Sequence, residues 1–144
     1  MTQPSQNEYP TLIHRWFGEV WNNQNATAID EMLADDVVMH GLADEPLVGR
    51  EAFKAFYEAF RNAFPDIHVT VDEVIENDGK IAARCTVRGS HTGDTLGFAA
   101  TNKPAHFTGI GMCHTKDGKF TEVWNEFNFM KMHVDLGTLR LDLA

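Results

Sequence analysis

The sequence is poor in cysteine, in basic residues and in long apolar runs. Its 144 residues include two cysteines, and 12 Lys and Arg side chains stand against 21 Asp and Glu, for a formal charge of −9. A chain this acidic repels phosphate backbones and anionic lipid headgroups, so we expect neither nucleic acid nor a membrane as a partner. No apolar run approaches the roughly 20 residues that span a bilayer, and MTQPSQNEYP has no basic stretch followed by an apolar one. Both absences favour a cytoplasmic protein.

Motifs for metals and nucleotide cofactors are also missing. Cys85 and Cys113 form no Cys-x-x-Cys pair, and the seven histidines include no His-Glu-x-x-His. Neither Gly-x-Gly-x-x-Gly nor a P-loop is present. We therefore expect no metal and no cofactor. The two cysteines are expected to be buried thiols, although a disulfide stays open if their strands are neighbours.

The length and the hydrophobic content of 43% are enough for one core. No composition shift divides the chain. We expect a flexible N-terminal tail over residues 1–8 and a single domain over residues 9–144.

Helical periodicity dominates the first half of the chain. It predicts an amphipathic helix over residues 9–22 and a short second helix that Asn25 caps and that Asp35-Asp36 ends. A strand follows over residues 37–40, and then an irregular loop over 41–49. A third helix has an almost wholly aromatic stripe. This stripe consists of Phe53, Phe56, Tyr57, Phe60 and Phe64.

From Ile67 onward the apolar period changes to two. The turn signals Asn77-Asp78-Gly79 and Lys116-Asp117-Gly118 predict hairpins that join residues 67–76 with 80–91 and residues 104–115 with 119–130. Helices first and antiparallel strands afterwards indicate an α+β fold. We expect three N-terminal helices to cover the concave side of a cone-shaped, strongly curved antiparallel sheet.

The last predicted strand has two distinct faces. Alternation from Phe120 puts Glu122, Trp124, Glu126 and Asn128 on one face, which is too polar for plain core and is typical of a cavity wall. The opposite set is apolar and is expected on the convex side. It consists of Val123, Phe127 and Phe129. A second copy covering that side predicts a homodimer through the convex sheet face.

Four stretches of the chain are characteristic in this order. They are EVWNNQNATAIDEMLADDVVMHG (Glu19–Gly41), VGREAFKAFYEAFRNAFPDIHVTVDEV (Val48–Val74), GSHTG (Gly89–Gly93) and GKFTEVW (Gly118–Trp124). With them the chain resembles the SnoaL-like polyketide cyclase or ester cyclase family of the nuclear transport factor 2-like superfamily, whose cone-shaped fold ketosteroid isomerase shares. The resemblance covers nearly the whole chain. It implies an enzyme that works without a metal.

The resemblance also implies a catalytic position. In the polyketide members an aspartate four residues after the tryptophan is the general acid/base of an aldol ring closure, and here that position is Asn128. An amide neither holds nor releases a proton at neutral pH, so Asn128 is left to orient or polarise a ligand carbonyl. Glu126, two residues earlier, is the candidate replacement base, because desolvation among aromatic rings raises a carboxyl pKa. The alternative is a glutamate that reaches solvent or pairs with an arginine.

Three histidines are further candidates for proton transfer. His40 and His91 match family positions near the cavity mouth, and His114 is expected to lie across the hairpin from Asn128. Each is also explained as a hydrogen-bonded structural residue. Glu122 is expected to form a salt bridge with Arg84 or Arg88.

These residues predict a cofactor-independent acid/base enzyme of the cyclase, isomerase or hydratase type, acting on an apolar, carbonyl-bearing, polyketide-like molecule. The residues expected to bind the substrate are Trp21, His40, Phe56, Tyr57, Phe60 and Trp124. The alternative is a non-catalytic binding protein of the same fold, which Asn128 favours. A purely structural module would show a collapsed cone without a cavity.

Overall fold

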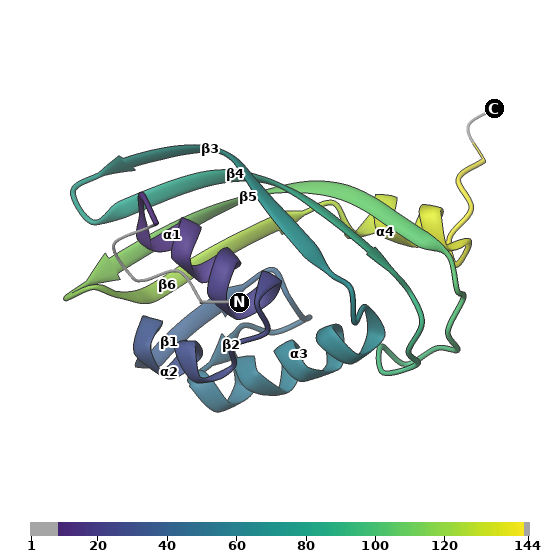
Figure 1. The fold of residues 1–144 in the computed structure, drawn as a ribbon, viewed down its shortest axis with the longest axis horizontal. Coiled ribbons are helices and arrows are strands. Elements are labelled where there is room, and N and C mark those ends of the chain that lie inside the picture. The colour runs from purple at the N-terminus through teal and green to yellow at the C-terminus, as the bar shows by residue number, and fades with distance from the viewer. Residues whose placement is uncertain (1–8, 143–144) are drawn as a thin grey trace.

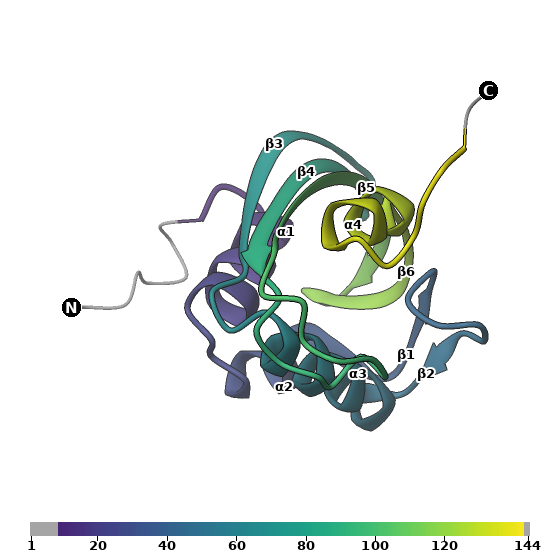
Figure 2. The same cartoon turned by 90° about the vertical axis from the view of Figure 1, so that its right-hand side faces the viewer.

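The computed structural model describes residues 9–142, so the tail predicted for residues 1–8 lies outside the described residues. A curved sheet wraps around helices from the first half of the chain (Figures 1 and 2). The elements are α1 (Leu12–Arg15), η2 (Trp16–Asn22), α2 (Thr27–Met32), β1 (Leu33–His40), β2 (Leu47–Val48), α3 (Arg50–Ala63), β3 (His68–Asn77), β4 (Lys80–Ser90), β5 (Pro104–Lys116), β6 (Lys119–Phe127) and α4 (Phe129–Leu136). Among residues 9–142, no helix has both the length and the apolarity needed to cross a bilayer.

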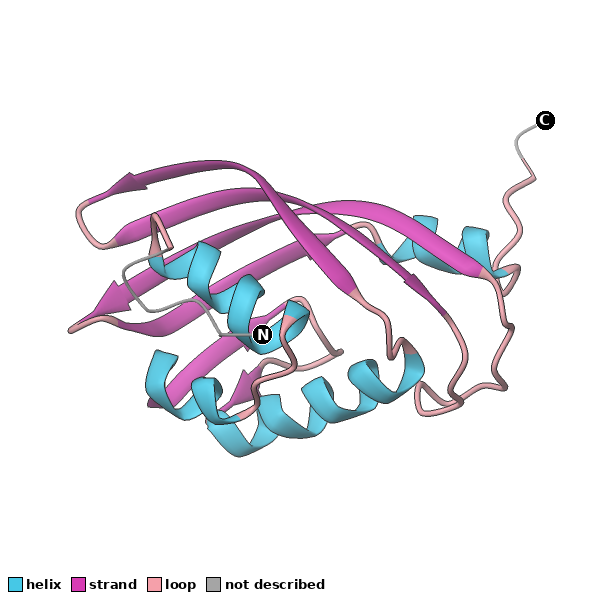
Figure 3. Ribbon diagram, viewed as in Figure 1, coloured by secondary structure: helices cyan, strands magenta, loops and turns pink. Residues whose placement is uncertain are grey.

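The sheet has six strands in the order β2-β1-β6-β5-β4-β3. The N-terminal helices lie on its concave side (Figure 3), which confirms the predicted α+β fold. One detail of the prediction was wrong, because β1 runs parallel to β6 and makes the sheet mixed. This pair adds β1 and β2 to the sheet by bringing the end of β1 beside the middle of β6.

The first predicted helix has two geometries. The side chain of Thr11 caps α1 by accepting from the backbone N–H of His14. From Trp16 onward the chain forms the π-helix η2, in which the N–H of Asn23 donates to the carbonyl of Gly18, five residues earlier. The wider π turn brings residues five apart onto one side, and Trp16 and Trp21 both face the interior.

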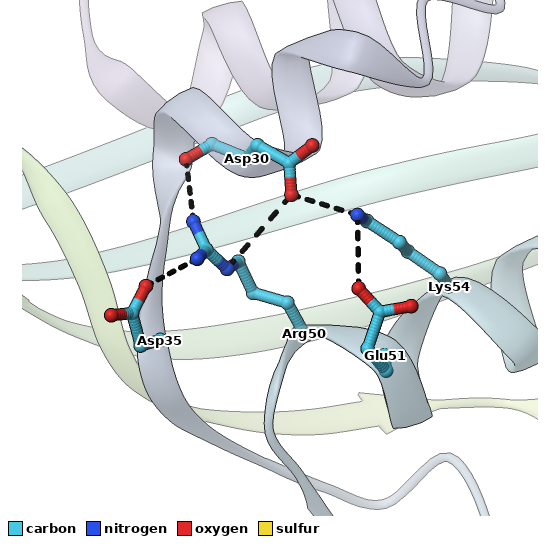
Figure 4. Close-up of polar contacts among 5 residues, drawn as sticks. All are labelled: Asp30, Asp35, Arg50, Glu51 and Lys54. Atoms are coloured by element: carbon cyan, nitrogen blue, oxygen red, sulfur yellow. Dashed lines mark hydrogen bonds and ion pairs between the residues drawn. The ribbon is translucent and has the colours of Figure 1, made fainter.

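The second helix ends earlier than predicted, at Met32, because β1 begins at Leu33. A cluster of exposed charges joins this corner to α3 (Figure 4). Arg50 donates to the carbonyl of Asp30 at 3.0 Å and forms an ion pair with Asp35. Lys54 contacts Asp30 at 2.8 Å, and this hydrogen bond lowers the pKa of that carboxyl. The cluster therefore fixes the start of α3 against the junction of α2 and β1.

Both predicted hairpins are confirmed, joining β3 with β4 and β5 with β6. Their turns have positive φ angles at both central residues, 51° and 76° at Asp78-Gly79 and 53° and 77° at Asp117-Gly118. Such two-residue turns match the right-handed twist of the strands. The sequence signals were therefore sufficient to fix the pairing of these strands.

Helix α4 was not predicted. Asn128 is its N-cap residue, since its side chain accepts from the N–H of Lys131 at 3.0 Å, and Gly137 ends the helix in the left-handed conformation. Lys131 donates to the carbonyl of His106 and Asp135 accepts from the N–H of His106, so α4 lies on the start of β5. An asparagine and a glycine at helical spacing were a usable signal for this helix.

A β-bulge in β6 decides which side chains face inward. Thr115 pairs with Phe120 and His114 with Glu122, which leaves Thr121 as an extra residue. Alternation is interrupted at that point, so Phe120 and Val123 both face the interior although they are three residues apart. The predicted face of β6 was therefore wrong from Glu122 onward. Asn125 and Phe127 face inward, and Trp124 faces outward with Glu122 and Glu126.

Candidate functional site

The interior between the helices and the sheet contains a cavity of about 70 Å³. Its wall is mostly aromatic. The rings that line it are Trp16, Phe17, Trp21, Phe53, Phe56, Phe60, Phe107, Phe120, Phe127 and Phe129. Pockets for drug-sized ligands measure roughly 300–1,000 Å³. The cavity is therefore suited to a small apolar molecule unless rings at its edge move.

Asn125 is the one side-chain amide in the part of this wall that the structure describes. Its Nδ2 donates to the carbonyl oxygen of His40 at 2.9 Å and lies 4.0 Å from Sδ of Met39, which fixes the orientation of the amide. No group within residues 9–142 donates to Oδ1 of Asn125. The cavity therefore offers an acceptor to a ligand hydroxyl or N–H group.

The lining residues within 9–142 include no carboxylate, imidazole, ammonium or guanidinium group. Their titratable groups are the thiols of Cys85 and Cys113, which are buried and free, as predicted. Burial raises the pKa of each thiol to about 12. Both are protonated at neutral pH and neither is a ready nucleophile.

The structure does not place Glu126 and Asn128 in this cavity. Glu126 is exposed on the outer sheet face beside Ile110, and Asn128 follows β6 as the exposed cap of α4. The expectation that both face the cavity was wrong, because the bulge at Thr121 reverses the alternation after it. Their catalytic roles stay predictions, and this placement gives them no route to a ligand in the cavity.

Three further predicted residues gather on the outer face of the sheet. Trp124 stacks on His40, with ring centroids 5.2 Å apart, and meets the edge of His114 at 4.8 Å. Nε2 of His40 lies 2.7 Å from Oε2 of Glu122. The predicted pairing of Glu122 with Arg84 or Arg88 was wrong.

His114 also does not meet Asn128. It pairs with Glu122, whereas the N–H of Asn128 donates to Thr108 near the other end of β5. The expected contact across the hairpin was wrong, because β6 continues past its bulge before Asn128 is reached. None of His40, Trp124 and His114 lines the cavity.

His91 is buried and holds the loop between β4 and β5. Its Nδ1 accepts from the backbone N–H of Thr101 at 3.0 Å, and its ring lies between Phe64 and Phe98. Within residues 9–142, Nε2 of His91 has no hydrogen-bond partner. Burial lowers the pKa of this imidazole below its ordinary value. His91 is not among the cavity-lining residues.

The loop that carries His91 is fastened to α3. The N–H groups of Thr92 and Gly93 both donate to the carbonyl of Ala63, and Oγ1 of Thr95 donates to the carbonyl of Ala59 at 2.5 Å. These hydrogen bonds hold the first part of the loop between β4 and β5 against the end of α3.

The predicted aromatic residues divide into two groups. Trp21, Phe56 and Phe60 line the cavity, but the hydroxyl of Tyr57 donates to the carbonyl of Val20 at 2.7 Å and lies in the core between α3 and η2. Whether they bind a substrate stays a prediction. The sequence reasoning missed Asn125. The signal was its place among the apolar residues Val123 and Phe127 on alternate positions of one strand.

The chain is similar to known proteins in sequence and in fold. The family model described as SnoaL-like polyketide cyclase matches residues 11–136. No curated protein matches the chain. IdmH from Streptomyces antibioticus, suggested to be a polyketide cyclase, is 27% identical, with a TM-score of 0.75 over 88% of this chain and 96% of its own.

Two other solved structures are also similar. AclR from Streptomyces galilaeus, suggested to be a hydroxylase, is 25% identical, with a TM-score of 0.79 over 94% of this chain and 100% of its own. A protein from Catenulispora acidiphila with a ketosteroid isomerase-like fold, solved in complex with trimethylamine, is 14% identical. Its TM-score is 0.76 over 91% of this chain and 95% of its own, a likeness of fold alone.

Proposed function

Because the chain belongs to the SnoaL-like polyketide cyclase family, we propose that it binds a small apolar molecule with one hydroxyl or enol group in its aromatic cavity. The observation that carries this proposal is the chemistry of the wall. Asn125 presents an acceptor there, and no described lining residue is charged at neutral pH. A wall without an acid or a base favours the non-catalytic binding protein, which is the alternative predicted from the sequence.

Apolar contact supplies most of the affinity in this proposal. Burial of apolar surface contributes about 25 cal/mol per Å², and aromatic walls add edge and face contacts to a flat ring. A ligand O–H that donates to Oδ1 of Asn125 adds about 1 kcal/mol, and a ligand without a donor leaves this acceptor unpaired. Asn125 is therefore expected to select among ligands of equal size.

The volume limits the size of the ligand. A cavity of about 70 Å³ holds on the order of five water molecules, which corresponds to a one-ring molecule. The protein of ketosteroid isomerase-like fold was solved with trimethylamine, which is smaller than a benzene ring. A polycyclic ligand requires the half-buried rings of Phe56, Phe127 and Phe129 to turn outward.

Phenol and toluene form a matched pair of probes, because they differ by a hydroxyl in place of a methyl group. We expect the protein to bind phenol roughly 5- to 10-fold more tightly than toluene in a calorimetric titration. Asn125→Leu removes this preference while toluene binding is kept. Glu126→Gln is the control, since Glu126 lies outside the cavity. Absence of binding for both probes, or a phenol preference that survives Asn125→Leu, would contradict the proposal.

The second candidate is the acid/base enzyme of the cyclase, isomerase or hydratase type. Family membership favours it, and so does His91, whose neutral ring has an unpartnered Nε2 among the described residues. A substrate would reach this nitrogen by parting Phe64 and Phe98. On a polyketide-like substrate that is turned over, His91→Asn should abolish turnover, whereas Glu126→Gln and His114→Gln should keep it. Full turnover by His91→Asn removes this candidate.

An Asn128→Asp variant tests the family's aldol cyclisation separately. A gain of turnover on a polyketide-like methyl ester would support a cyclase in which the acid has been lost. Unchanged turnover would fit the role of Asn128 as a helix cap.

We also infer that a second copy of the chain covers the outer sheet face. Ile110 and Met112 expose 54% and 42% of their surface there, and half-buried Trp124 lies beside Met112. An apolar strip at the middle of a sheet is typical of an interface. The dimer through the convex side therefore stays a proposal, and the residues that form the apolar strip differ from those expected.

A further inference from the structure

The outer faces of three adjacent strands differ in charge. On β4 the outward residues are basic at two positions, on β5 the central residues are apolar, and on β6 two outward residues are acidic. The three outward rows are Lys80, Ala82 and Arg84 on β4, Ile110, Met112 and His114 on β5, and Glu122, Trp124 and Glu126 on β6. We call these nine residues the outer patch. Its apolar middle is therefore flanked by opposite charges.

Strand register places these residues in lines across the sheet. Arg84, Ile110 and Glu126 form one line. Ala82, Met112 and Trp124 form the next, and Lys80, His114 and Glu122 form the third. Each line has a basic or small residue at its β4 end and an acidic or large residue at its β6 end.

Resting on the inference that a second copy covers this face, we propose that two copies pack outer patch to outer patch around a two-fold axis that runs along β5. A rotation about this axis places β4 of each copy over β6 of the other. Arg84 then lies opposite Glu126, and Lys80 lies opposite Glu122. Each ionic contact forms twice, as a two-fold interface requires.

Side-chain size is complementary in the same arrangement. Ala82 lies opposite Trp124, which His40 and His114 hold between their rings. The small side chain leaves room for the indole of the second copy. Aligned packing of two twisted sheets, at about −30°, keeps the central strands in contact along such a strip.

The other two-fold axis in the plane of the sheet, perpendicular to β5, is disfavoured. It would place β4 over β4 and β6 over β6, so that Glu122 lies opposite Glu126 and Lys80 opposite Arg84. Like charges in contact oppose association, and each copy already carries a formal charge of −9. The charges of the outer patch therefore select the axis along β5.

Three of the four charged side chains, Lys80, Arg84 and Glu126, form no short ion pair among the described residues. Arg84 is half-exposed and lies 3.7 Å from Asp72, a long ion pair. Within residues 9–142, neither Lys80 nor Glu126 takes part in an ion pair. Glu122 already lies 2.7 Å from Nε2 of His40, so the contact between Arg84 and Glu126 is the one that an interface gains without competing with a short ion pair.

A charge exchange tests the axis. Sedimentation velocity of the full chain at 150 mM salt measures the dimer dissociation constant for the parent, Arg84→Glu, Glu126→Arg and the double variant. Each single variant should weaken the dimer roughly 10-fold or more, since it places like charges in contact twice. The double variant should return to within about 3-fold of the parent. Arg88→Glu, the same charge change on the same strand, should have a smaller effect, because β6 has no acidic residue on its line.

The outcomes separate the axis from the proposals on which it rests. If both single variants weaken the dimer and the double variant does not recover, or if neither weakens it, the axis along β5 is wrong and the dimer stands. A parent that stays monomeric at 100 µM overturns both the dimer and the axis. Phenol binding is measured on the same parent sample, and its absence there contradicts the cavity proposal alone. Circular dichroism of each variant checks that the fold is kept.

Discussion

The ring of Phe127 lies across Gly109, where a Cβ atom on the glycine would approach the ring to 2.2 Å. Gly109 faces the interior from β5 and pairs with Phe127 on β6. Without a side chain at this position, the aromatic ring packs closely against the neighbouring strand and forms part of the cavity wall. The size of the cavity thus depends on the absence of one methyl group.

Gly109→Ala is expected to destabilise the protein. The new methyl group forces Phe127 out of its position, and overpacking of this kind costs about 1–3 kcal/mol of unfolding free energy. Gly111→Ala is the matched control on the same face of β5, since its Cβ would meet nothing nearer than a carbonyl oxygen at 3.8 Å. Urea unfolding measures both. Equal losses in the two variants would contradict the steric role of Gly109.

Asn128→Ala should remove the cap of α4. The side chain accepts from the N–H of Lys131, and loss of such a cap costs about 1 kcal/mol. Asn128→Asp should keep the stability, because aspartate caps equally well and its charge suits a helix N-terminus. Thermal unfolding of the three proteins tests this order. A stability loss in Asn128→Asp as large as in Asn128→Ala would show that capping is not its role.

The stability should fall in mild acid through His91. Burial holds the folded pKa of this imidazole below the ordinary value of 6.5. The unfolded chain therefore binds a proton that the folded chain does not, once the pH falls below about 6.5. The stability is complete above this pH, declines by up to about 1.4 kcal/mol per pH unit below it, and levels off below the folded pKa.

His91→Asn isolates this contribution. Its side-chain oxygen replaces Nδ1 as the acceptor for the N–H of Thr101, and it does not titrate. Urea unfolding from pH 8 to pH 5 should show a shallower decline in the variant than in the parent. Identical slopes would mean that His91 titrates alike in the folded and unfolded chains.

The two thiols should be unreactive in the folded protein. Cys85 and Cys113 are each 1% exposed, and burial raises the pKa of each to about 12. A disulfide-exchange reagent at pH 8 should label neither thiol rapidly, and should label both at once in urea. Rapid labelling without denaturant would show that the cavity opens widely. Slower labelling in the presence of phenol would then locate the ligand there.

Much of this fold followed from local sequence signals. Each Asp-Gly pair at a hairpin turn fixed the partners of two strands, because few residues tolerate the positive φ angles needed. The aromatic stripe predicted α3 and its inward face, and Phe53, Phe56 and Phe60 line the cavity. These signals depend on neighbours in the chain, so a single sequence is enough to read them.

Other features depended on contacts between distant segments. The parallel pairing of His40 with Trp124 joins residues 84 positions apart, and no local sequence pattern predicts it. The same pairing brings His40 to Glu122, in place of the arginine predicted for that carboxylate. The capping signals of Asn128 and Gly137 were present, but Asn128 was interpreted as a strand residue facing a ligand.

The sequence by itself determined the two hairpins, their turns, the aromatic helix α3 and the aromatic character of the interior, because hydrophobic periodicity and turn chemistry are local. Only the tertiary structure decided which side of β6 faces the cavity. The side-chain period of a strand is two, so the extra residue Thr121 exchanges the two faces of every residue after it. That exchange brings Asn125 into the cavity and turns Trp124, Glu122 and Glu126 toward the outer face of the sheet.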